Sequence, residues 1–208
     1  MSTPIISIQP DPIKLKISLE DMPVPVFRAI LVPAHISMGR LHEIIQSVMP
    51  WDDEHLYQFI DKMEKPAYKT GLITGDCMED DELEDAEETS LREEFLMKRK
   101  GAPFYYEYDF GDSWIHRITF EEVSQEDKNM FKGKAMLLEA EGNCPPENIG
   151  GPGGYQHFLT VINDPDNPEN ASLREWLEWD EDDRDPWDVN DVNIEILREF
   201  LGDYDKEI

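Results

Sequence analysis

The sequence predicts an α+β fold: a mostly antiparallel sheet in the first two thirds, covered by helices, and then a helical C-terminal third. Strand patterns dominate residues 1–140 and helical patterns follow them, a segregation typical of this class. Aromatic residues alternate through a hairpin at residues 105–120. Large rings on both faces favour a strand that is covered on both sides, so we expect this hairpin at the centre of the sheet. The length of 208 residues suits a single domain, residues 1–208.

Short runs of alternating or continuous apolar residues predict the other strands of the sheet. These runs occupy residues 13–19, 26–32, 55–60, 67–74 and 135–139. Among them, Ser37 can cap a helix whose apolar residues recur at helical spacing until Pro50. A capping box of Ser90 and Glu93 predicts a second helix, which continues to Lys98.

The last third of the chain is expected to contain three helices. The first begins near Tyr155, where apolar residues start to recur at helical spacing. Ser172 is expected to cap the second, and the third lies around residues 192–200. Asx and Pro turns separate the three segments.

An acidic stretch at residues 76–88 interrupts the strand patterns. Repulsion between its carboxylates predicts an extended, mobile loop. One interpretation is a loop exposed to solvent without a further role. The other is an acidic docking segment or a cation site.

A Gly-Asp pair sets the expected register of the aromatic hairpin. With Gly111 and Asp112 at the centre of a two-residue turn, Glu107 lies directly across from His116. Asp109, Asp112 and His116 are close together around this turn, and their oxygen and imidazole groups could hold a divalent cation. The other interpretation is structural: Asp112 supports the turn, Asp109 hydrogen-bonds locally and His116 pairs with Glu107.

The chain is strongly acidic, with 19 Lys and Arg against 47 Asp and Glu, a net charge of −28. Such a surface repels the phosphate backbone of nucleic acid, so we expect no binding to duplex nucleic acid. The best candidate for a local basic patch that could bind a duplex is the cluster of Lys98, Arg99 and Lys100. Because no stretch of 18 apolar residues and no basic leader pattern occurs, we expect no membrane insertion and a cytoplasmic location.

A loop rich in Pro and Gly precedes the first of the C-terminal helices. Gly150, Gly151, Gly153 and Gly154 allow positive φ or a close backbone approach. Such a loop either cradles an anion at the helix start or serves as a structural turn against the sheet. It has neither the third glycine of a dinucleotide fingerprint nor the Gly-Lys-Ser/Thr of a P-loop, so no cofactor is expected.

Two cysteines, Cys77 and Cys144, are too isolated for a structural zinc site. Cys144 could act as a nucleophile with His157 as its base. The prolines that follow Cys144 provide no helix dipole to lower the thiol pKa, and this argues against that chemistry.

The hairpin and the glycine loop together resemble one protein family. The residues concerned are Tyr-Tyr-Glu-Tyr-Asp-Phe-Gly-Asp-Ser-Trp-Ile-His at 105–116 and Cys-Pro-Pro-Glu-Asn-Ile-Gly-Gly-Pro-Gly-Gly-Tyr at 144–155. They resemble the plasmid Ri ORF-3-like proteins, some of which are described as passenger or "resolvase-like" proteins of insertion elements. The resemblance covers most of the chain and implies association with a mobile element, but it brings no catalytic residue. Neither the arginine-supported serine nor the His-x-x-Arg of recombinases occurs in the sequence.

These observations predict a non-enzymatic binding or accessory module that recognises a protein or peptide partner. The prediction is based on the lack of any recognisable nucleophile–base pair, cofactor loop or metal-ligand spacing in the sequence. The alternative is a divalent-cation-dependent hydrolase or nuclease-like enzyme that uses Asp109, Asp112 and His116.

The charge gives a first testable prediction. The protein should show no measurable affinity for duplex DNA at physiological salt, because its net charge of −28 opposes association. A fluorescence anisotropy titration with a labelled duplex measures this. Sub-micromolar binding that falls steeply with salt and is lost when Lys98, Arg99 and Lys100 are replaced would contradict the prediction.

Overall fold

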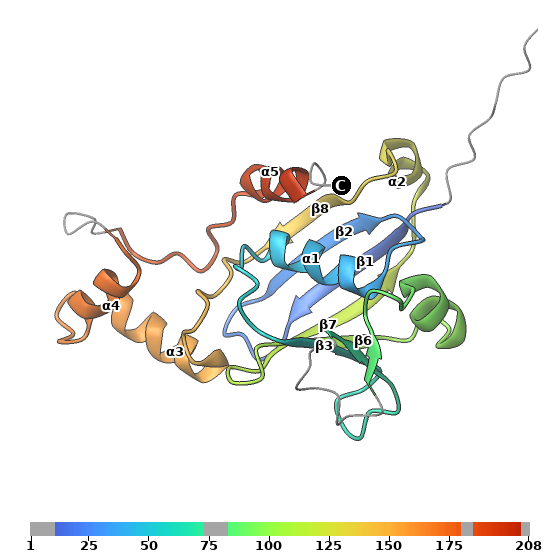
Figure 1. Ribbon diagram of the computed structural model, residues 1–208. Helices are drawn as coiled ribbons and strands as arrows, with labels where there is room; N and C mark the ends of the chain where they lie inside the picture. Colours follow the sequence, from blue (N-terminus) through green and yellow to red (C-terminus); the bar gives the residue numbers. More distant parts are fainter. Residues whose placement is uncertain (1–10, 73–82, 180–184, 205–208) are drawn as a thin grey trace, which may run out of the picture.

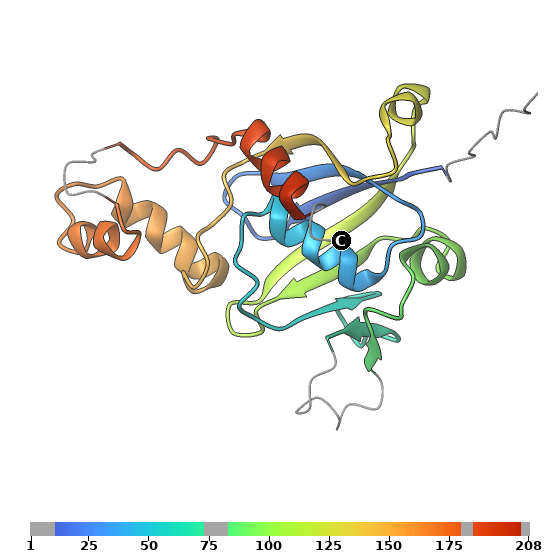
Figure 2. The same ribbon diagram turned by 45° about the horizontal axis from the view of Figure 1, so that its top comes forward.

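A computed structural model describes residues 11–72, 83–179 and 185–204 of the chain. Its main element is an eight-stranded sheet in the order β5-β4-β3-β6-β7-β1-β2-β8, and Figures 1 and 2 show it with α1 lying across one face. The strands are β1 (Ile13–Leu19), β2 (Val26–Val32), β3 (Tyr57–Ile60), β4 (Lys69–Gly71), β5 (Leu83–Asp85), β6 (Phe104–Tyr108), β7 (Trp114–Glu121) and β8 (Met136–Glu141). The helical elements are α1 (Met38–Val48), the π-helix η2 (Arg92–Lys98), α2 (Gln125–Met130), α3 (Gly151–Ile162), α4 (Asn170–Trp176) and α5 (Ile194–Tyr204).

The expected α+β fold with a mostly antiparallel sheet is confirmed, and the aromatic hairpin of β6 and β7 lies at the centre of the strand order. One strand pair, β4 with β5, is parallel. Strand β5 is formed by Leu83–Asp85, within the acidic stretch that we expected to be a loop. That expectation is therefore wrong at residues 83–85, because main-chain pairing with β4 fixes them. Residues 76–82 and Cys77 lie outside the described residues.

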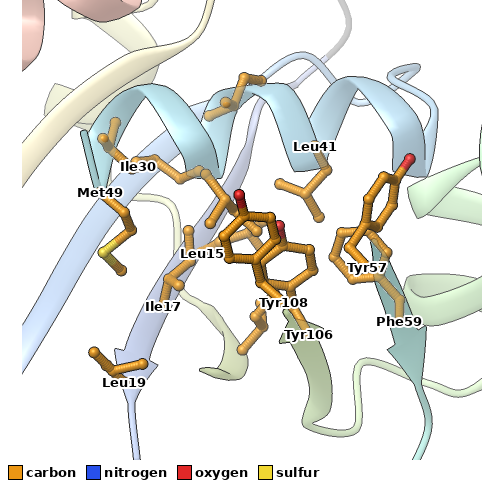
Figure 3. Packing of buried hydrophobic residues seen from close by; sticks show 14 of the residues in the cluster. Leu15, Ile17, Leu19, Ile30, Leu41, Met49, Tyr57, Phe59, Tyr106 and Tyr108 are labelled. Carbon is orange, nitrogen blue, oxygen red and sulfur yellow. The ribbon is translucent and has the colours of Figure 1, made fainter. Parts of the chain in front are cut away.

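The core lies between α1 and the sheet, and the sequence pattern accounts for both sides of it. Strand β1 alternates buried and half-buried residues along its whole length. Helix α1 begins where the Ser37 hydroxyl accepts a hydrogen bond from the main-chain N–H of Arg40 at 3.0 Å, as its cap pattern predicted. Beneath α1, the rings of Tyr106 and Tyr108 stack side by side, with their centroids 6.4 Å apart (Figure 3).

The hairpin has a longer turn than the sequence predicted. Tyr108 pairs with Trp114, so the turn contains residues 109–113, and Tyr106, not Glu107, lies opposite His116. Asp109 and Ser113 have φ of 55° and 54°, and this left-handed backbone at each end of the turn closes a wider loop than a two-residue turn would. The one-residue change of register places His116 on the buried face of the sheet.

Three helices follow β8 in the described part of the chain, but residues 163–169, 177–179 and 185–193 are not helical, so the last third is helical only in part. Helix α4 begins at Asn170, and Ser172 lies inside it, where its hydroxyl donates to the Glu169 carbonyl at 2.9 Å. The expected Ser172 cap is therefore wrong. Helix α5 packs against α1 and β8 through Leu197 and Leu201, whereas α3 and α4 extend beyond the end of the sheet (Figures 1 and 2). No helix in the described ranges is long and apolar enough to cross a membrane.

The glycine loop makes two close main-chain contacts. Gly151 has φ of +66°, and a Cβ there would come within 2.3 Å of the Asp112 carbonyl oxygen. A Cβ on Gly154 would come within 1.9 Å of the Ile149 carbonyl oxygen. Gly153 has no atom within 4 Å of its Cβ position. Helix α3 begins at Gly151, earlier than Tyr155. Neither Gly151 nor Gly154 has room for a Cβ, so the start of the helix requires glycine at both positions.

This geometry separates three alanine substitutions that the sequence alone would group together. Gly151→Ala and Gly154→Ala should each lower the free energy of unfolding by about 1 kcal/mol or more, through left-handed strain or a main-chain clash. Gly153→Ala should be neutral or stabilise by up to about 1 kcal/mol, because it adds helix propensity without a contact. Urea midpoints measure all three, and equal losses at every position would contradict the assignment.

Candidate functional site

Three loops meet at one end of the sheet, and each has a residue with left-handed backbone. They are the α1–β3 connection, the β6–β7 turn and the loop before α3. Among their left-handed residues are Asp53, Asp109 and Asn148, with φ of 56°, 55° and 60°. Asp and Asn are the non-glycine residues that adopt this conformation most readily. Left-handed backbone at non-glycine residues is uncommon and is enriched at functional sites, and three loops that contain it meet at this end of the sheet.

Side-chain hydrogen bonds hold the three loops together. His55 Nε2 lies 2.9 Å from Asn148 Oδ1 and 3.6 Å from Asp109 Oδ2. The Tyr108 hydroxyl donates to Glu147 Oε1 at 2.5 Å and accepts from the Glu54 N–H at 3.0 Å. Burial and the nearby Glu147 carboxylate raise the pKa of Tyr108, so its hydroxyl keeps the proton it donates. The loops therefore form a fixed rim.

An acidic cleft of about 320 Å³ opens beside this rim. Its lining residues are His42, Glu43, Asp53, Glu54, His55, Leu56, Tyr57, Leu72 and Glu87. Four of these residues carry a carboxylate and none is Lys or Arg. Glu43 forms an ion pair with Arg40 at 2.5 Å, so part of its charge is already neutralised. Leu56 and Leu72 are 39% and 43% exposed, so the cleft combines negative charge with exposed apolar surface.

His42 links the acidic cleft to the core. Its Nε2 lies 2.8 Å from Asp53 Oδ1, and its Nδ1 lies 2.7 Å from the hydroxyl oxygen of Tyr106. Gln46, one turn further along α1, donates to the same hydroxyl from Nε2 at 2.9 Å. The imidazole stacks on the Tyr57 ring with centroids 3.6 Å apart and planes 8° apart. Both ring nitrogens and one ring face of His42 are thus occupied.

His42, Gln46 and Asp53 were not predicted from the sequence as residues of a site. A signal was available for the first two, because both are polar residues spaced by one turn among the apolar residues of one side of the helix. Buried polar side chains need partners, and a search for those partners leads to Tyr106 and Asp53. Asp53 has no comparable pattern, since it follows the helix in an exposed loop.

The structure does not bring together the three residues proposed as cation ligands. Asp109 Oδ1 accepts from the Gly111 N–H at 2.9 Å, and Asp112 Oδ2 accepts from the Gly150 N–H at 3.0 Å. His116 points into the core, where its Nδ1 bonds to the Trp114 carbonyl at 3.2 Å and burial lowers its pKa to about 3. Within the described ranges, no group of three His, Cys, Asp or Glu side chains is placed to hold a metal ion.

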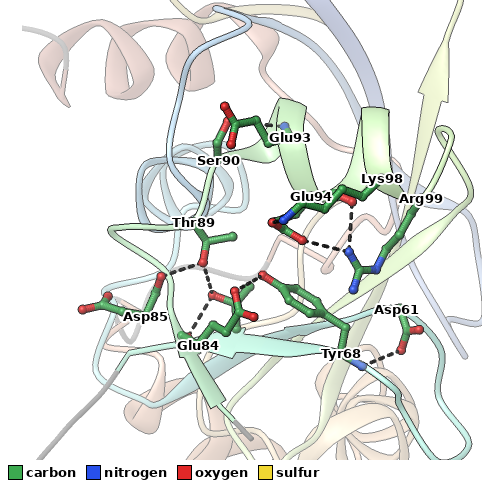
Figure 4. Close-up of polar contacts among 11 residues, drawn as sticks. Asp61, Tyr68, Glu84, Asp85, Thr89, Ser90, Glu93, Glu94, Lys98 and Arg99 are labelled. Atoms are coloured by element: carbon green, nitrogen blue, oxygen red, sulfur yellow. Dashed lines mark hydrogen bonds and ion pairs between the residues drawn. The ribbon is translucent and has the colours of Figure 1, made fainter.

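The basic cluster of Lys98, Arg99 and Lys100, at the C-terminal end of η2, is partly paired with neighbouring side chains. Glu94 forms ion pairs with both Lys98 and Arg99 (Figure 4). The Arg99 guanidinium also lies 3.8 Å from the centroid of the Tyr68 ring, an arrangement that favours a cation–π interaction. Two of the three cations are thus engaged within the chain.

Cys144 and His157 lie in different surroundings. Cys144 is buried, and its Sγ lies 3.8 Å from Met49 Sδ. Burial raises the pKa of the Cys144 thiol to about 12. His157 is exposed on α3 and pairs with Glu169 at 3.1 Å. A raised pKa is the opposite of what a nucleophilic thiolate needs, so this pair has the character of a structural thiol and a surface ion pair.

The thiol gives a prediction that separates the two roles of Cys144. In a Cys77→Ser variant at pH 8, the remaining thiol should react with a disulfide reagent at a rate set by unfolding. Burial raises the pKa of the thiol and so lowers its thiolate fraction well below that of an ordinary cysteine. Stopped-flow absorbance measures the rate, with the urea-unfolded chain as the reference. A rapid reaction in the folded state would contradict the structural role.

Comparisons with known proteins agree with this fold. A family model for plasmid pRiA4b ORF-3-like proteins matches residues 12–195. An uncharacterised protein, y4hQ, of Sinorhizobium fredii (strain NBRC 101917 / NGR234) is 38% identical over 160 residues, which is 74% of each chain. The crystal structure of a protein of unknown function from Methanosarcina mazei Go1 superposes with a TM-score of 0.70 at 24% identity, covering 89% of this chain and 96% of that one. The match of the family model over most of the sequence shows that this chain belongs to the plasmid pRiA4b ORF-3-like family.

Proposed function

We propose that this protein is a non-enzymatic binding module that recognises a basic segment of a protein or peptide partner through the acidic cleft. One observation carries the proposal: among the described residues that line the cleft of about 320 Å³, four carry a carboxylate and none is Lys or Arg. A concave site that carries one sign of charge concentrates the field and attracts ligands of the opposite sign. The overall charge of −28 supports the same choice of partner.

The apolar part of the cleft supports a Lys or Arg side chain over an inorganic cation. Lys and Arg side chains lay their methylene stems along apolar surface while the charged group reaches polar partners. Leu56 and Leu72 offer such a surface, and Asp53, Glu54 and Glu87 offer the carboxylates. A bare divalent cation would contact only the carboxylates and would leave the two leucines exposed.

Three further parts of the proposal are based on the sequence and on the family match. We propose that the module acts in the cytoplasm as one domain and is associated with a mobile element. The support for the last point is the plasmid origin in the name of the matching family. The alternative of a cation-dependent hydrolase needs Asp109, Asp112 and His116 to converge, and their present partners are three different neighbours.

A charge-matched pair of variants tests the cleft. Asp53→Asn with Glu54→Gln removes two charges from the cleft, and Glu126→Gln with Glu175→Gln removes two from exposed helix surfaces elsewhere. Asparagine tolerates the left-handed backbone at residue 53. With a hexa-arginine peptide as the probe, the cleft variant should bind about tenfold more weakly, and the control should differ from the parent by less than about twofold. Isothermal titration calorimetry measures both.

Equal losses in the two variants would mean general attraction to an acidic surface and would contradict recognition by the cleft. A thermal-shift series with Mg²⁺, Mn²⁺ and Ca²⁺ tests the alternative, because a ligand of the native state raises the apparent stability. A shift of several degrees that disappears in Asp109→Asn would favour the hydrolase.

A further inference from the structure

A chain of hydrogen bonds runs from the core to the acidic cleft through Gln46, Tyr106, His42 and Asp53. Its successive heavy-atom distances are 2.9, 2.7 and 2.8 Å. Gln46, His42 and Tyr106 are buried, and Asp53 alone reaches the surface, with a side chain that is 40% exposed. The chain therefore ends at a carboxylate that lines the cleft.

The direction of each hydrogen bond follows from the groups themselves. An ionised carboxylate only accepts hydrogen bonds, so His42 Nε2 must carry the proton that is shared with Asp53. In a neutral imidazole, Nδ1 is then an acceptor, and the Tyr106 hydroxyl must donate to it. Burial raises the pKa of Tyr106 well above its ordinary value, so that proton stays on the hydroxyl. Gln46 completes the chain by donating to the Tyr106 oxygen.

The ring of His42 is also fixed in orientation. It lies flat on the Tyr57 ring, with 8° between the planes, so a partial rotation of the imidazole would break the stack, and a 180° flip would break both hydrogen bonds. Asp53 has φ of 56°, and its Oδ1 is held by His42. Its exposed side chain can still present the second oxygen to a ligand. A carboxylate held in this way binds a cation without the entropy loss of a free side chain.

We propose that His42 is a positioning residue: Tyr106 and Gln46 hold its ring from the core side, and its Nε2–H orients the Asp53 carboxylate for the cationic group of the partner. This role rests on the proposed function of the cleft. It resembles the way in which outer partners orient the side chains that bind a metal ion. Among the carboxylates of the cleft, Asp53 is thus the one that a buried histidine orients.

Two variants of His42 separate positioning from packing. In His42→Gln, the amide nitrogen takes about the place of Nε2 and can still donate to Asp53. His42→Leu keeps the bulk and loses the donor. With hexa-arginine as the probe, we expect the Leu variant to bind about tenfold more weakly and the Gln variant to stay within about threefold of the parent.

The tautomer is measured without a ligand, by ¹⁵N NMR of the labelled imidazole rings. The parent and a Tyr155→Phe control should show His42 protonated at Nε2 alone. The control removes another hydroxyl of a buried ring, one that accepts from Trp187 Nε1 at 3.2 Å. Tyr106→Phe removes the partner of Nδ1 but leaves the carboxylate on Nε2, so the proton should stay on Nε2, whereas Asp53→Asn should divide the His42 signal between the two tautomers.

The outcomes distinguish the two proposals. A parent chain that does not bind hexa-arginine overturns the function of the cleft and the role that rests on it. A parent that binds, together with a His42→Leu variant of equal affinity, overturns only the positioning role. A His42 ring protonated at Nδ1 in the parent also overturns it, whatever the affinities.

Discussion

The Tyr106 hydroxyl is the constraint on which this end of the molecule depends. Its ring is fully buried in the central strand β6 and packs on Phe59 and His116, with centroids 4.8 and 5.3 Å away. A buried hydroxyl without a partner would cost about 1–3 kcal/mol. Helix α1 supplies the partners, His42 and Gln46, and is thereby placed on the sheet by polar as well as apolar contacts. The acidic cleft forms where this arrangement reaches the surface.

The turn of the central hairpin determines which side chains reach the core and which reach the rim. A two-residue turn would have put His116 across from Glu107, but the wider turn puts it opposite Tyr106. His116 then packs edge-on to Trp51, with ring centroids 5.3 Å apart. The same turn directs Asp109 toward His55. His55 also contacts Asn148, so it links the turn to the loop before α3. One residue of register thus separates a core histidine from a surface one.

Much of the fold could be predicted from local patterns, and most of the site could not. Alternation located β1, and the Ser37 cap located α1, because both signals depend on neighbours in the sequence. The hairpin register depends on left-handed backbone at Asp109 and Ser113. The Gly-Asp pair is typical of a two-residue turn, so the sequence predicted a shorter turn and a different register. Gly151 lies against the Asp112 carbonyl, and the cleft likewise joins loops that are far apart in the sequence. A periodic pattern depends on neighbouring residues, so it does not predict contacts of this kind.

The central claim is that one acidic cleft, and not the acidic surface as a whole, recognises a basic partner. Chemical-shift mapping on the ¹⁵N-labelled protein tests this most directly, with hexa-arginine added at physiological salt, where attraction between exposed charges decays over about 8 Å. The account predicts that the perturbed main-chain amides gather at residues 53–57 and around Leu72 and Glu87, which line the cleft from three segments. Perturbations spread evenly over the acidic surface, or centred on α3 and α4, would contradict it.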